Sequence, residues 1–191
     1  MDGKRTFIQA TVDRFTETGI KLKHVFIVVT SEEQRRLATQ QLPGVPKKQI
    51  LIIPDDFDFA GAMIEGTRLI HEKHPQAIVV STPADHCIVD SRGFSNTVSK
   101  AVHHVSSFLN QSVLVGVHVD DIPTLTGCGH IRYTTETNES GVNRVIGFIE
   151  KPDAETAANL LHDGNTVCNT AITIWRADQI VKRTKNLSLT G

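Results

Sequence analysis

Short apolar runs alternate along the chain with segments in which apolar residues recur every three or four positions. The runs are rich in valine and isoleucine, which is typical of strands buried on both faces. They predict strands at 24–30, 49–54, 76–82 and 112–119. The periodic segments predict a helix that ends at Gly19 and further helices over 31–42, 60–74 and 91–109. This alternation is typical of a mostly parallel sheet with helices on both faces.

The last third of the chain follows a different pattern. Two strands, at 129–135 and 143–152, flank a short polar loop and predict a small hairpin insertion. A helix over 153–162, capped by Asp153, then leads to a final strand at 171–177. Because neither a repeat nor a low-complexity linker interrupts the sequence, residues 1–191 are predicted to form a single α/β domain.

Composition narrows the class of partner. The 191 residues are 39% hydrophobic and 21% charged, with a formal net charge of -1, as in ordinary globular proteins. Such a balance creates no field that attracts nucleic acid or an anionic membrane surface. No apolar run approaches the roughly 18 residues of a membrane span, and the first residues contain no signal-peptide core. We therefore expect a cytoplasmic protein with neither nucleic acid nor membrane as partner.

The three cysteines, Cys87, Cys128 and Cys168, lie about 40 residues apart. No Cys-x-x-Cys pair and no cysteine–histidine group has the spacing of a zinc site. In a cytosolic chain, cysteines of this kind are predicted to be reduced, small core residues.

A carboxylate follows the third predicted strand, in the sequence Pro-Ala-Asp-His. Ligands of open α/β sheets bind beyond the carboxyl ends of the strands, which is where Asp85 is expected. A carboxylate close to a phosphate needs a cation between them, usually Mg²⁺. The alternative is that Asp85 only caps a turn.

A second group of candidates lies in the predicted hairpin. Glu150 can accept hydrogen bonds from sugar hydroxyls, and Lys151 supplies a positive charge for a phosphate. The alternative is a solvated charge pair before a helix. The glycine-rich stretch 126–130 can bring backbone N–H groups close to a ligand, although Gly-x-Gly is also common in turns.

Taken in order, these stretches resemble the mannose-1-phosphate guanylyltransferases, within the sugar nucleotidyltransferases. The similarity extends over about residues 7–177. Its matching blocks are FIQATVDRF, VFIVVTSEEQ, LPGVPKKQILIIP, TPADHCIVD, TGCGHI, VNRVIGFIEKPDAETA and CNTAITIWRA. The resemblance implies a three-layer α/β/α Rossmann-like nucleotidyltransferase fold with a mostly parallel sheet and a small hairpin insertion.

The resemblance also implies a reaction and its residues. Members of the family transfer a guanylyl group from GTP to mannose 1-phosphate, giving GDP-mannose and pyrophosphate. Catalysis there is largely positioning and neutralisation of phosphate charge by Mg²⁺ and basic groups. Carried over by position, Asp85 is the Mg²⁺ ligand and, with Lys151, a catalytic candidate. The sugar side is assigned by the same resemblance to Gly127, Glu150 and Asn169, with Lys151 on the sugar phosphate.

The chain departs from the family pattern in several places. The family's first strand and its loop G-G-x-G-x-R-L-x-P have no counterpart after position 1, and its second metal-binding aspartate falls beyond the last residue, so we expect a domain truncated at both ends. The block E-P-x-x-R-N-T-A-P-A is replaced by IPDDFDFAGA at 53–62. Ala171 stands at the glycine of W-N-S-G, which impairs the site if that glycine needs a positive φ.

Three hypotheses remain open. In the first, the chain is part of an active sugar nucleotidyltransferase. In the second, it is a non-catalytic homologue that acts as a sugar-phosphate-binding or regulatory module. In the third, it serves only as a partner surface for an active paralogue. We predict that GTP turnover by this chain alone is at background. The family's first strand is central in its sheet, and loss of this strand would expose backbone groups on the two neighbouring strands. We therefore expect low stability or repair through a homodimer.

Overall fold

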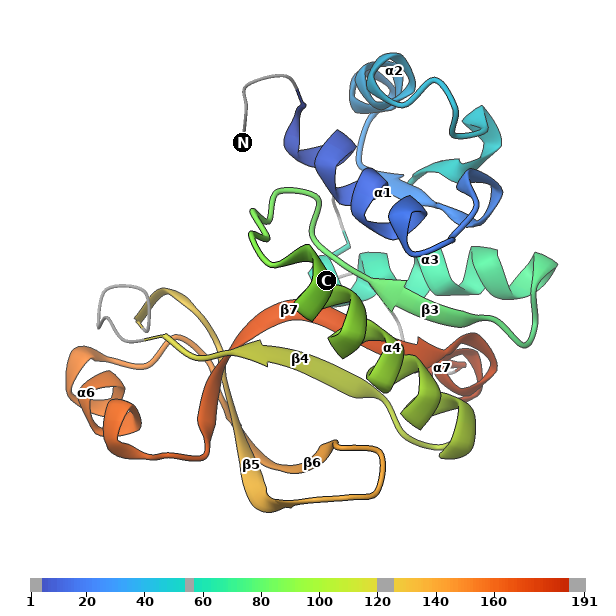
Figure 1. Ribbon diagram of the computed structural model, residues 1–191. Coiled ribbons are helices and arrows are strands. Elements are labelled where there is room, and N and C mark those ends of the chain that lie inside the picture. The colour runs from blue at the N-terminus through green and yellow to red at the C-terminus, as the bar shows by residue number, and fades with distance from the viewer. Residues whose placement is uncertain (1–4, 54–56, 120–125, 186–191) are drawn as a thin grey trace. The chain divides into compact units, whose positions relative to one another are not determined.

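The computed structural model describes residues 5–53, 57–119 and 126–185 (Figure 1). The chain divides into two compact units. The first unit comprises 1–79, 83–96 and 176–191, and the second comprises 80–82 and 97–175.

The first unit packs helices against a small parallel sheet. Its strands β1 (Ile27–Val29) and β2 (Ile50–Ile52) pair in parallel, with Ile27 opposite Ile50. The helices that belong wholly to this unit are α1 (Phe7–Glu17), α2 (Glu32–Gln41), α3 (Phe59–Lys73) and α7 (Ala177–Thr184). Single 3₁₀ turns at Leu22–His24 and Lys47–Gln49 precede the two strands.

Side-chain caps fix where these helices begin. Thr6 and Gln9 form a reciprocal capping box at the start of α1. Ser31 accepts a hydrogen bond from the Gln34 N–H, and Asp58 accepts one from the Gly61 N–H. None of the helices in the described ranges is both long enough and apolar enough to cross a membrane.

The apolar residues of α1, α2, β1 and β2 form one core of the first unit. Its buried members are Val12, Val29, Ala38, Leu42, Val45 and Ile50. Each helix contributes the face that the hydrophobic spacing predicts, and the strands contribute the apolar run. The core therefore follows directly from the sequence pattern.

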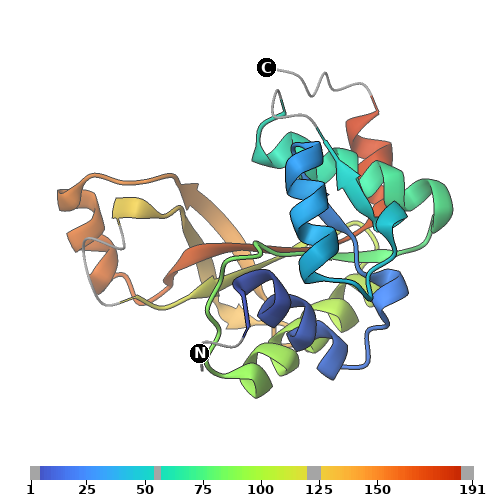
Figure 2. The same ribbon diagram turned by 90° about the horizontal axis from the view of Figure 1, so that it is seen from above.

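The second unit is built on a five-stranded sheet with the order β3-β7-β5-β6 and β4 also paired to β7. Its strands are β3 (Ile78–Ser81), β4 (Val113–Val117), β5 (His130–Thr137), β6 (Asn143–Ile149) and β7 (Thr166–Arg176). The first two residues of β3 belong to the first unit. Helix α4 (Ser91–Ser107) enters from the first unit, and α6 (Ala154–His162) connects β6 to β7. Figures 1 and 2 show β7 as the long strand beside which β4 and β5 run.

The prediction of a mostly parallel sheet is wrong for this part of the chain. The β4–β7, β5–β6 and β5–β7 pairs are all antiparallel, and among the pairs whose register is described only β1–β2 is parallel. The reason is that β7 pairs in the antiparallel direction with β4 and β5, which lie far from it in the chain, and hydrophobic patterning does not specify such pairing. Helix α7 was not predicted, and β7 begins at Thr166, before the predicted 171, because its first residues are polar.

Candidate functional site

The start of β5, the end of β6 and a position within β7 bring two of the predicted sugar-side residues, Glu150 and Asn169, together in the second unit. In the sheet, His130 lies opposite Ile149 of β6 and also opposite Cys168 of β7. The residues next to these positions, Gly129, Glu150 and Asn169, therefore share one end of the sheet. The Asn169 N–H donates a 2.7 Å hydrogen bond to the Gly129 carbonyl. We call Gly129, Glu150, Lys151 and Asn169 the strand-end cluster.

Gly129 allows the Glu150 carboxylate to approach the backbone. A Cβ at position 129 would lie 2.7 Å from Glu150 Oε2 and 2.6 Å from Phe148 Cζ, which is closer than real Cβ contacts. By contrast, Gly127 is exposed and has no atom within 4 Å of where its Cβ would be. The sequence pattern pointed to Gly127, whose contact with a sugar stays a prediction, and it missed Gly129. Gly129 is recognisable only once Glu150 is seen beside it.

A rigid turn presents Glu150 and Lys151 at the end of β6. Lys151 has a φ of 39°, which is uncommon for a residue with a side chain. Pro152 is buried, and the Asp153 carboxylate accepts a 2.8 Å hydrogen bond from the Thr156 N–H to begin α6. The turn is thus fixed by a strand on one side and a capped helix on the other. The Lys151 side chain is exposed, and it makes no ion pair with any residue in the described ranges.

A bulge in β7 shapes the opposite side of the strand-end cluster. Gly116 of β4 pairs with Asn169 and Val115 pairs with Ile172, so two residues of β7 are extra. The Asn169 Oδ1 accepts a 3.1 Å hydrogen bond from the Ala171 N–H, which holds the bulge. Ala171 has a φ of 56°. Lys151 and Ala171 are the non-glycine residues with positive φ in the described chain, and strain of this kind gathers at ligand sites.

Replacing Ala171 by glycine is expected to stabilise the protein. A residue with a side chain in the left-handed region costs roughly 1–2 kcal/mol of stability, and the glycine variant avoids this cost. The larger backbone entropy of glycine in the unfolded chain offsets about half of that benefit. We expect Ala171→Gly to raise the free energy of unfolding by about 0.5–1 kcal/mol, measured by urea denaturation. The matched control is Ala158→Gly in the interior of α6, which should lower it by about 1 kcal/mol. Equal destabilisation by both variants would contradict the strain assigned to Ala171.

His130 is the buried polar residue beside the strand-end cluster. Its side chain is fully buried, and burial lowers the pKa of His130 while the Cys128 backbone and the negative charge of Glu150 act to raise it. The imidazole is therefore neutral at neutral pH. The charge of Glu150 is close enough to act on this ring, which agrees with its position beside Gly129.

The loop with Asp85 belongs to the first unit, where α1 holds it. Thr11 Oγ1 donates to the Ala84 carbonyl at 3.4 Å, and the Arg14 guanidinium donates to the His86 carbonyl at 3.3 Å. The backbone is thus fixed on both sides of Asp85, whose side chain is exposed. Arg14 lies 5.3 Å from the centre of the Phe94 ring.

Arg14 contacts the loop that contains Asp85, and the sequence pattern did not reveal this contact. Arg14 is only 6% exposed, and burial lowers the pKa of its guanidinium. Thr11 and Arg14 are three residues apart on one face of α1, the spacing at which two helical side chains can reach the same segment. That spacing was available in the sequence, but the target loop was not.

The chemistry of Asp85 suits a magnesium ion. Mg²⁺ prefers oxygen ligands and is usually held by one or two carboxylates together with phosphate oxygens and water. The Asp85 carboxylate makes no hydrogen bond or ion pair with any residue that the structure describes, so its oxygens are accessible. Its role as a ligand stays a prediction.

The cysteines differ from the expectation. Cys128 and Cys168 form a disulfide, and Cys87 is exposed rather than in the core. The prediction of three reduced core thiols is therefore wrong. The pairing arises because the β5–β7 register places Cys168 opposite His130, two residues beyond Cys128. Sequence spacing alone cannot show a contact made through strand register.

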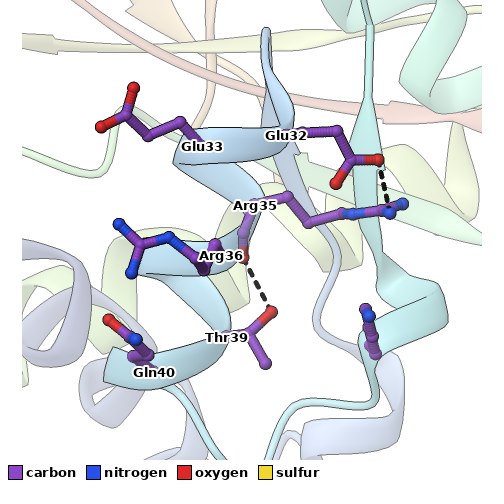
Figure 3. A pocket seen from close by; sticks show the side chains of 7 residues that line it. Glu32, Glu33, Arg35, Arg36, Thr39 and Gln40 are labelled. Atoms are coloured by element: carbon purple, nitrogen blue, oxygen red, sulfur yellow. Dashed lines mark hydrogen bonds and ion pairs between the residues drawn. The ribbon is translucent and has the colours of Figure 1, made fainter.

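A separate surface pocket of about 530 Å³ lies along α2 (Figure 3). It is lined by Glu32, Glu33, Arg35, Arg36, Thr39, Gln40 and Lys47. Glu32 and Arg35 extend toward each other as an ion pair, and Thr39 Oγ1 donates to the Arg35 carbonyl at 2.7 Å. None of the predicted site residues lines the pocket. We interpret it as a solvated helix face.

Comparison with known proteins identifies the family. The nucleotidyl transferase family matches residues 1–190. Among curated proteins, a mannose-1-phosphate guanylyltransferase of Salmonella montevideo is 27% identical over 97% of this chain and 39% of its own length. The alginate biosynthesis protein AlgA of Pseudomonas aeruginosa is also 27% identical, over 97% of this chain and 38% of its own. The chain thus spans about two fifths of the length of these relatives.

Solved structures agree on the fold. Mannose-1-phosphate geranyltransferase from Thermus thermophilus superposes with a TM-score of 0.81 at 21% identity, covering 95% of this chain and 50% of the other. Mannose-6-phosphate isomerase from Helicobacter pylori superposes with a TM-score of 0.78 at 20% identity, covering 97% of this chain and 67% of the other. The predicted α/β nucleotidyltransferase fold is confirmed at this level. The three-layer arrangement stays a prediction.

Proposed function

The chain belongs to the nucleotidyl transferase family, and from that premise we propose that it contributes the sugar-phosphate side of a sugar nucleotidyltransferase site. The substrates proposed are mannose 1-phosphate and GTP, and the products are GDP-mannose and pyrophosphate. The relatives described as mannose-1-phosphate guanylyltransferase support this choice. The observation that carries the proposal is the strand-end cluster, in which a carboxylate, a free ammonium group and an amide gather at one end of a sheet.

Each member of the strand-end cluster has a role that its chemistry suits. The Glu150 carboxylate accepts hydrogen bonds from vicinal sugar hydroxyls, and the Lys151 ammonium neutralises the sugar phosphate. The Asn169 Oδ1 is engaged by the Ala171 N–H, and Asn169 makes no side-chain donation to a residue in the described ranges. Its amide N–H groups are therefore free to donate to a sugar oxygen.

Magnesium would take part through Asp85. When bound, the ion would neutralise phosphate charge during transfer of the nucleotidyl group. Asp85 would be one oxygen ligand, held by the α1 contacts to its neighbours. Lys151 would hold the attacking sugar phosphate in place, which is the positioning that nucleotidyl transfer mainly needs.

A second candidate function, a non-catalytic sugar-phosphate-binding module, is favoured by the altered block at 53–62. Ile53 is buried in the core, and Asp58 caps α3 through the Gly61 N–H. Phe59 is 57% exposed, and residues 54–56 lie outside the described ranges. Side chains engaged in packing and capping are not available to bind a nucleotide base.

Calorimetric titrations with each substrate, together with an assay of pyrophosphate release, test both candidate functions. We expect mannose 1-phosphate to bind the chain alone and GTP with Mg²⁺ to bind at least about tenfold more weakly, because the altered block lacks polar contacts. Pyrophosphate release from the two substrates together should equal that of a no-protein control. Release above that control would establish transfer by this chain and remove the second candidate. Absence of mannose 1-phosphate binding would contradict both.

A further inference from the structure

We propose that Cys128, His130 and Cys168, with both thiols reduced, form a binding site for a zinc ion. One ligand atom from each residue, two Sγ atoms and a ring nitrogen, lies within 4.8 Å of the other two. The site does not depend on nucleotidyl transfer, since it uses residues that the proposed function leaves unassigned. In the disulfide form the two sulfurs are bonded to each other and the metal is excluded.

The distances fit a tetrahedral zinc ion. The His130 Nε2 lies 3.6 Å from the Cys168 Sγ and 3.9 Å from the Cys128 Sγ. A zinc ion with Zn–S of about 2.3 Å and Zn–N of about 2.0 Å places its sulfur and nitrogen ligands about 3.6 Å apart. Once the disulfide is reduced, the two sulfurs need only separate to about 3.8 Å, and the imidazole is already at the right distance.

The strands supply the scaffold for these ligands. Cys128 and His130 are two residues apart where β5 begins, and Cys168 lies opposite His130 on β7. The Cα atoms of Cys128 and Cys168 are 6.2 Å apart. Because backbone hydrogen bonds fix the β5–β7 pairing, His130 and Cys168 are held on strands, and Cys128 lies two residues before β5.

The environment of His130 calls for a partner of this kind. The His130 ring is completely buried. On the Nε2 side the groups within reach are the two sulfurs, which are weak hydrogen-bond acceptors. A buried imidazole with such poor partners is costly, and a metal ion bound to Nε2 would offset that cost.

Two thiolates and one imidazole select the class of metal. Thiolate and imidazole ligands favour Zn²⁺ over Mg²⁺ or Ca²⁺, which prefer oxygen. Three protein ligands leave the fourth position for water or another oxygen ligand. His130 and Cys168 are buried, whereas Cys128 is half-buried, so the metal would enter from the Cys128 side. Binding would release the thiol protons.

Titration with Co²⁺ as a spectroscopic probe tests this site. The intact chain, reduced with a phosphine and freed of metal, should develop thiolate-to-cobalt charge-transfer absorption and visible d–d bands that saturate at one equivalent. Addition of one equivalent of Zn²⁺ should remove both. Cys128→Ser and Cys168→Ser should weaken cobalt binding about tenfold or more, whereas Cys87→Ser, the exposed cysteine, should leave it unchanged.

A comparison that needs no variant keeps the proposal testable if the serine variants fold poorly. The wild-type chain oxidised to the Cys128–Cys168 disulfide, verified by its mass, should give no charge-transfer band at the same cobalt concentration. A reduced chain without the band would overturn the proposal. So would equal binding by the reduced and oxidised forms, or loss of the band in Cys87→Ser alone.

Discussion

Gly129→Ala is expected to weaken mannose 1-phosphate binding by about tenfold or more, whereas Gly127→Ala should leave it within about twofold. The new methyl group would meet the Glu150 carboxylate and the Phe148 ring at 2.6–2.7 Å. Because both neighbours must move, Glu150 loses the position from which it would accept hydrogen bonds from a sugar. Gly127 has open space, so the same substitution two residues earlier is a matched control.

The binding constants of both variants should be measured by calorimetry with mannose 1-phosphate. Circular dichroism verifies that Gly129→Ala keeps its fold, and Glu150→Gln provides a second variant that removes the charge without crowding the backbone. Both Gly129→Ala and Glu150→Gln should weaken binding. Wild-type affinity in both would show that Glu150 does not contact the ligand.

Arg14→Ala is expected to lower the free energy of unfolding by about 2–3 kcal/mol. The substitution removes the packing of a buried guanidinium on Phe94 and its hydrogen bond to the His86 carbonyl. Arg5→Ala is the control, since Arg5 pairs with Asp13 at the surface near the same helix. Exposed ion pairs contribute little, so this variant should unfold at nearly the same urea concentration as the wild type.

The same variant tests the positioning of Asp85. Hydrogen exchange at residues 84–88 should accelerate in Arg14→Ala and stay unchanged in Arg5→Ala, because only Arg14 contacts that loop. A merely destabilised protein would instead exchange faster throughout. Unchanged exchange at 84–88 with reduced global stability would show that Arg14 supports the core but not the Asp85 loop.

The sequence predicts most elements of the fold but not the direction of every strand. The Asp153 helix cap and the apolar runs of β1 and β2 depend on local chemistry, and they are found where predicted. The antiparallel pairing of β7 with β4 and β5 depends on contacts between residues far apart in the chain. Hydrophobic patterning carries no information on such pairing, so the parallel sheet was a wrong prediction.

The candidate site shows the same division between local and distant effects. The Glu150–Lys151–Pro152 turn could be located from sequence because the strand end, the proline and the capping Asp153 are consecutive. Gly129 and the Cys128–Cys168 pair could not be located from sequence, because their contacts depend on the register of β5 with β6 and β7. The positive φ of Ala171 agrees with the family's glycine at that position.

Homodimer formation, the single domain and the cytoplasmic location stay predictions. A dimer would be detected by sedimentation equilibrium over a range of chain concentrations. A dimer would agree with the expected repair, since unpaired strand edges favour association. A monomer at all concentrations would contradict the expected repair by pairing.

The most direct test of the strand-end cluster is an NMR titration of the ¹⁵N-labelled chain with mannose 1-phosphate. We predict that the backbone amides of Gly129, Glu150, Lys151 and Asn169 shift together along one saturation curve. Residues of the α2 pocket should not move. Shifts confined to the α2 pocket, or no saturable shift at the four amides, would contradict a sugar-phosphate site at this end of the sheet.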